Sequence, residues 1–165
     1  MERINHNIEP LYDRNSRILI LGSFPSVKSR EMQFFYGHPQ NRFWRVIAAL
    51  TDYPVPHTIE DKKKMLHENH IALWDTIASC EIEGSSDSSI KGVVPNNLNI
   101  ILETAPIHAV YCNGTKSYEL YHKYCEKQTG MPAFKLPSTS PANAACSLDR
   151  LIKEWSVIMD RLRAV

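Results

Sequence analysis

Two asparagines stand at positions where an amide side chain can take part in chemistry. Asn41 lies directly before an Arg-Phe-Trp run, and Asn113 stands between the apolar run 109–112 and Gly114. A side-chain amide offers a carbonyl acceptor and two N–H donors, and its charge does not change with pH. An amide at position 41 is able to hold and orient a water molecule through its carbonyl. Asn113 is suited to pairing with a ring edge that presents a donor and an acceptor together.

A structural role accounts for the same two residues. Asparagine is a favoured N-cap, so Asn41 can begin a helix over residues 41–50. The dipeptide Asn113-Gly114 is typical of a tight turn. Both interpretations stay open as long as only residue types and their spacing are considered.

A glycine-containing turn follows a continuous apolar run near the N-terminus. Residues 17–21 read Arg-Ile-Leu-Ile-Leu, which is typical of a strand buried on both faces. The run ends in Gly-Ser-Phe-Pro-Ser over residues 22–26, so small hydroxyls and backbone N–H groups lie at the carboxyl end of the strand. Ligands bind at that end in open α/β sheets. Polar turns at 113–114 and 138–143 also follow predicted strands, so we expect the three turns to converge on one crevice.

The alternation of apolar runs and amphipathic segments predicts an α/β fold. Strand and helix candidates follow one another along the chain, which is typical of a parallel sheet covered on both faces. We expect a three-layer α/β/α sandwich with a central, mainly parallel, four-stranded sheet. The predicted strands are 17–21, 71–74, 109–112 and 133–136, and the predicted helices are 41–50, 58–69, 100–103, 116–127 and 148–162. Three segments are expected outside these elements: an N-terminal arm over residues 1–16, a loop or short helical turn over 27–37, and mostly loop over 83–97.

The length and composition predict one domain, residues 1–165, with a single core. The net charge of +1 gives no indication of nucleic-acid binding, so such a function would need a local basic face. The N-terminus shows no apolar signal region and no stretch has the length of a membrane span, so we expect a monomeric cytoplasmic protein without a membrane contact. The cysteines form no Cys-x-x-Cys pair, which argues against a zinc site; they are Cys80, Cys112, Cys125 and Cys146. Basic residues near the first motif are Arg14, Arg17, Lys28, Arg30, Arg42 and Arg45.

Taken in order, these segments resemble the motifs of the uracil-DNA glycosylase superfamily. The run Phe-Tyr-Gly-His-Pro-Gln-Asn-Arg-Phe-Trp is similar to one in mismatch-specific uracil-DNA glycosylases. The Gly-Ser-Phe-Pro-Ser turn resembles the hypoxanthine (deoxyinosine)-DNA glycosylase branch most closely. The later matching segments are residues 72–75, 84–90, 112–114 and 136–143.

The resemblance implies a monofunctional DNA glycosylase that acts in base excision repair. Such an enzyme flips a deaminated base out of DNA and hydrolyses its N-glycosidic bond. Hypoxanthine is the first expected substrate, with uracil and xanthine as further candidates. The partner is then DNA that contains deaminated bases, and the chemistry requires no metal and no cofactor. The aligned turns contain no obvious catalytic lysine, so no strand cleavage is expected.

The resemblance also assigns roles to single residues. The implied catalytic residues are Asn41 and Asn113, and the implied base-binding residues are Gly22, Ser23, Phe24, Tyr36 and Asn113. Tyr36 matches the aromatic position that stacks on the base. Phe24 stands where many members of the superfamily have a polar, water-binding residue, which moves that role to Asn41. The implied DNA contacts are Ser26, Ser85, Ser138, Thr139, Ser140, Pro141, Ala142 and Asn143.

Two other functions fit parts of the same pattern. One is a mismatch-specific uracil/thymine-DNA glycosylase, which shares the first motif. The other is a non-catalytic nucleotide- or phosphate-binding α/β module that uses the turn at 22–26. An enzyme would leave alkali-labile abasic sites in DNA, whereas a binding module would leave the strand intact.

Overall fold

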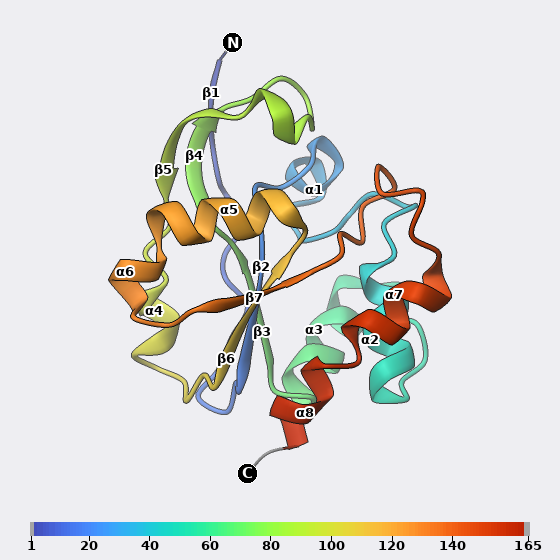
Figure 1. The fold of residues 1–165 in the computed structure, drawn as a ribbon. Helices are drawn as coiled ribbons and strands as arrows, with labels where there is room; N and C mark the ends of the chain where they lie inside the picture. Colours follow the sequence, from blue (N-terminus) through green and yellow to red (C-terminus); the bar gives the residue numbers. More distant parts are fainter. Residues whose placement is uncertain (1, 164–165) are drawn as a thin grey trace.

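The computed structural model, which describes residues 2–163, contains a central sheet of four parallel strands (Figure 1). The strands lie in the order β3-β2-β6-β7, and each neighbouring pair is parallel. The predicted α/β fold with a four-stranded parallel sheet is confirmed. The strands are β2 (Ile18–Gly22), β3 (Ile71–Asp75), β6 (Ala109–Asn113) and β7 (Ala133–Leu136).

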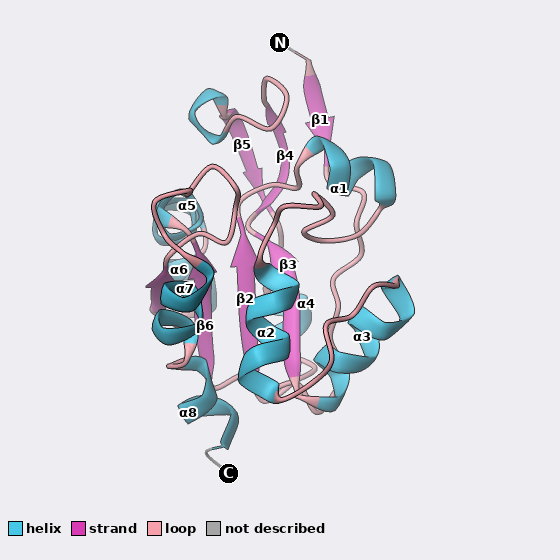
Figure 2. Cartoon of the chain, turned by 90° about the vertical axis from the view of Figure 1, so that its right-hand side faces the viewer, coloured by secondary structure: helices cyan, strands magenta, loops and turns pink. Residues whose placement is uncertain are grey.

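Helices cover both faces of this sheet and make the outer layers (Figures 1 and 2). One face carries α4 (Asn99–Leu102), α5 (Thr115–Tyr124) and α6 (Glu126–Thr129). The other face carries α2 (Phe43–Thr51), α3 (Ile59–Glu68), α7 (Leu148–Trp155) and α8 (Ile158–Arg163). The core lies between these layers, which explains why the strands β2, β3 and β6 are buried along their whole length; β3 is an edge strand, and the N-terminal segment covers it through a bridge between Leu11 and Leu73.

Three further strands form a small antiparallel sheet at the carboxyl end of the central sheet. They are β1 (Arg3–Asn5), β4 (Ile77–Glu81) and β5 (Lys91–Pro95), in the order β1-β4-β5. The chain passes from β3 into β4 through Thr76 alone. The prediction of mostly loop over 83–97 is therefore wrong for β5, and the N-terminal arm contributes β1. These strands escape prediction because β1 and β5 lie at sheet edges and are largely exposed, so they carry no apolar run.

Helix boundaries differ from the predictions where the chain turns. The predicted helix 148–162 is two helices, α7 and α8, separated at Ser156 and Val157. The predicted helix 116–127 is likewise divided at Cys125. A short helix α1 (Val27–Met32) follows the first turn, in agreement with the short helical turn expected there. Among the residues described, no helix combines the length and apolar character of a membrane span.

Candidate active site

A cavity of about 410 Å³ lies at the carboxyl ends of β2, β3 and β6. The turn at 22–26, the start of α2 and the loop after β7 form its walls, so segments far apart in the sequence meet as predicted. Asn143 is the one predicted site residue that does not line this cavity; it lines an adjoining groove. The predicted residues that do line it are Gly22, Ser23, Phe24, Ser26, Tyr36, Asn41, Ser85, Asn113, Ser138, Thr139, Ser140, Pro141 and Ala142.

A chain of hydrogen bonds through Thr139 connects the two asparagines. Asn113 Nδ2 donates to Thr139 Oγ1 at 3.0 Å, and Thr139 Oγ1 donates to Asn41 Oδ1 at 2.8 Å. The backbone N–H of Thr139 donates to Asn113 Oδ1 at 3.0 Å. A hydroxyl has one proton, so the direction of this chain is set: Thr139 accepts from Asn113 and donates to Asn41. Thr139 is completely buried, which argues against its predicted contact with DNA.

The carbonyl oxygen of Asn41 accepts two hydrogen bonds. Besides the Thr139 hydroxyl, the backbone N–H of Phe43 donates to Asn41 Oδ1 at 2.9 Å. This second bond closes an Asx-type turn directly before α2, whose N-cap is Arg42, so the expected N-cap role of Asn41 is not the one observed. A carbonyl oxygen has two lone pairs, so none remains for the water that the sequence analysis assigned to it. Asn41 still lines the cavity, and within residues 2–163 its Nδ2 group makes no hydrogen bond.

Tyr36 places an unpaired hydroxyl at the inner end of the cavity. Its ring stacks on Phe43 with 4.3 Å between centroids, and its backbone has a φ of 50°, which is unusual for a residue other than glycine. The hydroxyl oxygen is buried and has no hydrogen-bond partner among the described residues. Burial, followed by the negative charge of Asp75, raises the pKa of Tyr36 far above its usual value, although the nearby Asn113 side chain, which is outside hydrogen-bond geometry, acts in the opposite direction. The phenol therefore stays protonated and keeps its proton available to donate.

Asp75 and His6 form a buried pair beside this hydroxyl. His6 Nε2 lies 2.8 Å from Asp75 Oδ2, and both side chains are almost completely buried. The second carboxylate oxygen, Asp75 Oδ1, would lie 2.3 Å from a Cβ atom placed on Gly22. Only glycine leaves room for this carboxylate at the cavity wall, which explains why the first turn begins with Gly22.

The Arg42 guanidinium holds the loop that follows β7. It donates to the carbonyl oxygens of Ser140 at 2.9 Å and Asn143 at 3.0 Å, and also to that of Cys146. The backbone N–H of Arg42 donates to the carbonyl of Thr139 at 3.1 Å. Arg42 is one of the basic residues near the first motif, but its guanidinium group bonds to backbone carbonyls of the protein itself.

Hydroxyl groups brace the same loop from within. Ser138 Oγ accepts from the backbone N–H of Ser140 at 3.1 Å, and Ser140 Oγ accepts from that of Ala142 at 3.1 Å. Asn143 Nδ2 donates to the Ser138 carbonyl at 3.0 Å. These bonds within residues 138–143 fix the shape of the loop.

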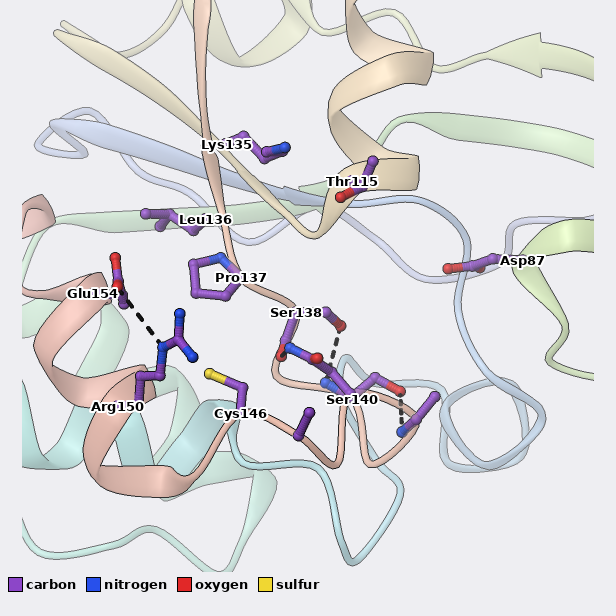
Figure 3. Close-up of a pocket in the computed structure, with 13 residues that line it drawn as sticks. Asp87, Thr115, Lys135, Leu136, Pro137, Ser138, Ser140, Cys146, Arg150 and Glu154 are labelled. Atoms are coloured by element: carbon purple, nitrogen blue, oxygen red, sulfur yellow. Dashed lines mark hydrogen bonds and ion pairs between the residues drawn. The ribbon is translucent and has the colours of Figure 1, made fainter.

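A more open groove adjoins the cavity (Figure 3). It has a volume of about 710 Å³ and lies between the start of α5, the loop after β7 and the helix α7. Lys135 and Arg150 contribute positive charge, and Arg150 Nε lies 4.0 Å from Glu154 Oε1. The cavity and the groove adjoin, and four residues line both: Asp87, Ser138, Ser140 and Ala142.

Asp87 marks the boundary between the cavity and the groove. Ser23 Oγ donates to Asp87 Oδ1 at 3.1 Å. Asp87 is exposed to solvent, and the partial desolvation by surrounding atoms raises the pKa of its carboxyl, while the Ser23 hydrogen bond and Lys116 act in the opposite direction. Within residues 2–163 no three His, Cys, Asp or Glu side chains gather in an arrangement that could hold a metal ion.

Comparison with known proteins decides the family. A family model described as the uracil DNA glycosylase superfamily matches residues 9–158. The chain belongs to the uracil DNA glycosylase superfamily. It is 35% identical over 157 residues to a hypoxanthine DNA glycosylase of Methanosarcina acetivorans, with 94% of this chain and 98% of that protein covered.

Further superfamily relatives agree in sequence and in fold. A hypoxanthine DNA glycosylase of Methanosarcina barkeri is 36% identical over 112 residues, which cover 67% of this chain and 71% of that protein. A candidate uracil DNA glycosylase from Methanosarcina acetivorans, solved by solution NMR, superposes with a TM-score of 0.80 at 34% identity. That match covers 94% of this chain and 96% of the other. The resemblance inferred from the sequence motifs is therefore confirmed at the level of the superfamily.

Three residues of this glycosylase-superfamily site were missed by sequence reasoning. Asp75 ends one of the matched segments, yet its type alone gave no reason to prefer it to other acidic residues. Asp87 lies in a serine-rich stretch that reads as loop. His6 precedes all the motifs, and its contact with Asp75 spans 69 positions, so no local signal could reveal it.

Proposed function

We propose that this chain is a monofunctional DNA glycosylase that excises deaminated bases, hypoxanthine first and uracil or xanthine second. The observation that carries this proposal is the full-length match to a relative named as a hypoxanthine DNA glycosylase. The cavity at the carboxyl ends of the strands supports it, because its lining is rich in amides and hydroxyls and it adjoins an open groove.

The chemistry of base excision needs donors at the departing base. The sugar develops positive charge in the transition state while negative charge spreads onto the base, so fixed N–H and O–H donors facing the base lower the barrier. Asn41 and Asn113 each have amide hydrogen left over after their internal bonds, and Tyr36 has an unpaired hydroxyl. We assign catalysis to Asn41 and Asn113, and base contacts to Gly22, Ser23, Phe24, Tyr36 and Asn113.

The groove is suited to the DNA strand next to the flipped nucleotide. It adjoins the cavity, and Lys135 and Arg150 offer cationic groups along it beside the acidic Asp87 and Glu154. Hydrogen bonds to phosphate oxygens can come from the polar side chains of Ser138, Ser140 and Asn143. Pro141 and Ala142 are small apolar residues on the same loop, which suits the space that a flipped base leaves in the duplex. We assign further contacts with DNA to Ser26 and Ser85 and expect the protein to act as a cytoplasmic monomer.

The proposal is tested with oligonucleotides that each contain one altered base. Wild-type protein should leave alkali-labile sites at deoxyinosine, and fewer or none at adenine and cytosine in the same sequence. The matched control is Arg45→Lys, because Arg45 is exposed on α2 and does not line the cavity. Excision confined to uracil or thymine in G mismatches would instead support the mismatch-specific alternative. Binding with every strand left intact after alkali would support a non-catalytic binding module and overturn the proposal.

A further inference from the structure

The hydrogen bonds of Thr139 set the polarity of the Asn41 amide. Because Asn41 Oδ1 accepts from both Thr139 and the Phe43 backbone, the amide cannot rotate by half a turn without losing both bonds. The rotated amide would also bring its N–H groups against two donors. The orientation seen here is therefore strongly preferred, and the group left to the cavity is the Nδ2 amide with two N–H donors.

The Thr139 hydroxyl could not do this alone. Its own proton points to Asn41 only because Asn113 Nδ2 donates to its oxygen, at 3.0 Å. Asn113 is itself oriented by the backbone N–H of Thr139, which donates to Asn113 Oδ1. All three groups are thus ordered by one buried chain of bonds, and such chains polarise their members in a low-dielectric interior.

We propose that Thr139 is a positioning residue that fixes the Asn41 amide with its N–H groups, and not its carbonyl, toward the substrate. This proposal rests on the proposed glycosylase function. It assigns Asn41 to the departing base, since a donor stabilises the negative charge that forms there. A nucleophilic water needs an acceptor for its proton, and the saturated carbonyl of Asn41 does not supply one.

The first test replaces Asn41 by aspartate. A carboxylate keeps the two acceptor bonds to Thr139 and Phe43 but offers an acceptor where the amide offered donors. We expect Asn41→Asp to lower the single-turnover rate at deoxyinosine by about 100–1,000-fold, as for the loss of one positioned donor. It should be no faster than Asn41→Ala. If Asn41 instead held water through an acceptor, Asn41→Asp would be clearly faster than Asn41→Ala, and that result would overturn the proposal.

The second test separates positioning from structure at Thr139. Thr139→Val keeps the shape but removes the hydroxyl, and we expect the single-turnover rate to fall about 100-fold, as for a misplaced reacting group. Affinity for DNA should change little, and Thr139→Ser should recover most of the rate. Thr51→Val is the matched control, because the Thr51 hydroxyl bonds only to the Ile47 carbonyl of its own helix. In the Asn41→Ala background, Thr139→Val should have a much smaller effect, which is confined to what acts through Asn113.

A spectroscopic measurement keeps the proposal testable without any activity. In 1H–15N spectra, the side-chain amide signals of Asn41 and Asn113 should move in Thr139→Val and return toward their wild-type positions in Thr139→Ser. Signals that do not move would overturn the positioning role. If the signals move in Thr139→Val but the wild-type protein excises no base, the proposed function is overturned and the positioning role of Thr139 remains. Should Thr139→Val fail to fold, Asn41→Asp and the spectrum of Thr139→Ser decide the question.

Discussion

The two sides of the cavity differ in how completely their polar groups are paired. On the side of α2 and β6, Asn41, Thr139 and Asn113 form a continuous chain in which the buried acceptors are occupied. The Tyr36 hydroxyl, in contrast, is buried by Gly22 and Asp75 and has no hydrogen-bond partner among residues 2–163, although Asp75 lies close by and is bonded to His6.

This difference suggests a division of labour. An unmade hydrogen bond of a buried group costs about 1–3 kcal/mol, so an isolated hydroxyl persists only where something else requires it. The paired side keeps its geometry before DNA arrives, whereas the unpaired side holds a donor in reserve for a ligand. Substitutions on the two sides should therefore have different consequences.

Removing the Asn41 amide should have the largest effect. We expect Asn41→Ala to lower the single-turnover excision rate by about two to four orders of magnitude, because a fixed donor at the developing charge is lost. Affinity for DNA should change little, since the groove is untouched. Near-wild-type excision by folded Asn41→Ala would mean that Asn41 serves only the turn at the start of α2.

Replacing Asn113 by aspartate should disturb both base choice and the paired chain. A carboxylate has no N–H for Thr139 Oγ1, and it would face the oxo group of hypoxanthine with negative charge. We expect excision at deoxyinosine to fall by about 100-fold, and excision at deoxyuridine to fall as well. Rates are compared with those of Asn113→Ala, after circular dichroism has shown that both variants fold. Wild-type rates for both bases in both variants would make Asn113 a turn residue only.

On the unpaired side, stability and activity should move in opposite directions. Tyr36→Phe removes a buried hydroxyl without a partner, so the free energy of unfolding should rise by about 1–3 kcal/mol. The same change removes one donor to the base, so excision should fall by about tenfold. Urea unfolding and single-turnover assays measure the two effects. A variant that is less stable than wild type would mean that the hydroxyl already has a partner in the free protein.

The Arg42 contact tests how far the paired side depends on the loop after β7. Arg42→Lys cannot reach three carbonyl groups at once, so we expect the free energy of unfolding to fall by about 1.5–3 kcal/mol. Arg45→Lys on the exposed face of the same helix should change it by less than about 0.5 kcal/mol. Equal effects of the two substitutions would contradict the role given to Arg42.

The smallest expected effect concerns the reactivity of the buried cysteines. Burial raises the pKa of Cys112 to about 12 and that of Cys125 to about 11, and it also raises the pKa of Cys80. A thiol reacts as its thiolate, so these groups should be inert toward a thiol reagent at pH 8 in the folded protein and react after unfolding in urea. Rapid labelling of Cys112 in the folded state would show that β6 opens readily.

The elements that build the central sheet could be predicted, because their residue types match their surroundings. The runs that became β2, β3 and β6 are apolar throughout, and burial on both faces demands that pattern. The strand β5 could not be predicted, since its Lys-Gly-Val-Val-Pro sequence lies at an exposed edge and is held by backbone bonds to β4.

The candidate site was predicted in its location but not in its bonding. Strand ends collect polar turns, so the place of Asn113 beside one crevice followed from the topology, whereas that of Asn41 was implied by the family resemblance. The bonds through Thr139 join residues 98 and 26 positions apart, and the bond between His6 and Asp75 depends on how the N-terminal segment folds back. Such contacts leave no periodicity in a single sequence. The hydroxyl of Thr139 therefore looked like a surface group, although it is completely buried.

The most direct test of the account is the identity of what leaves the DNA. Wild-type protein is incubated with duplexes that differ only in carrying deoxyinosine or deoxyadenosine at one position, and the small products are identified by mass spectrometry. The account predicts release of free hypoxanthine, a strand that stays uncut until alkali is added, and no release of adenine. Release of both bases at similar rates, or binding of the deoxyinosine duplex without any released base, would contradict it.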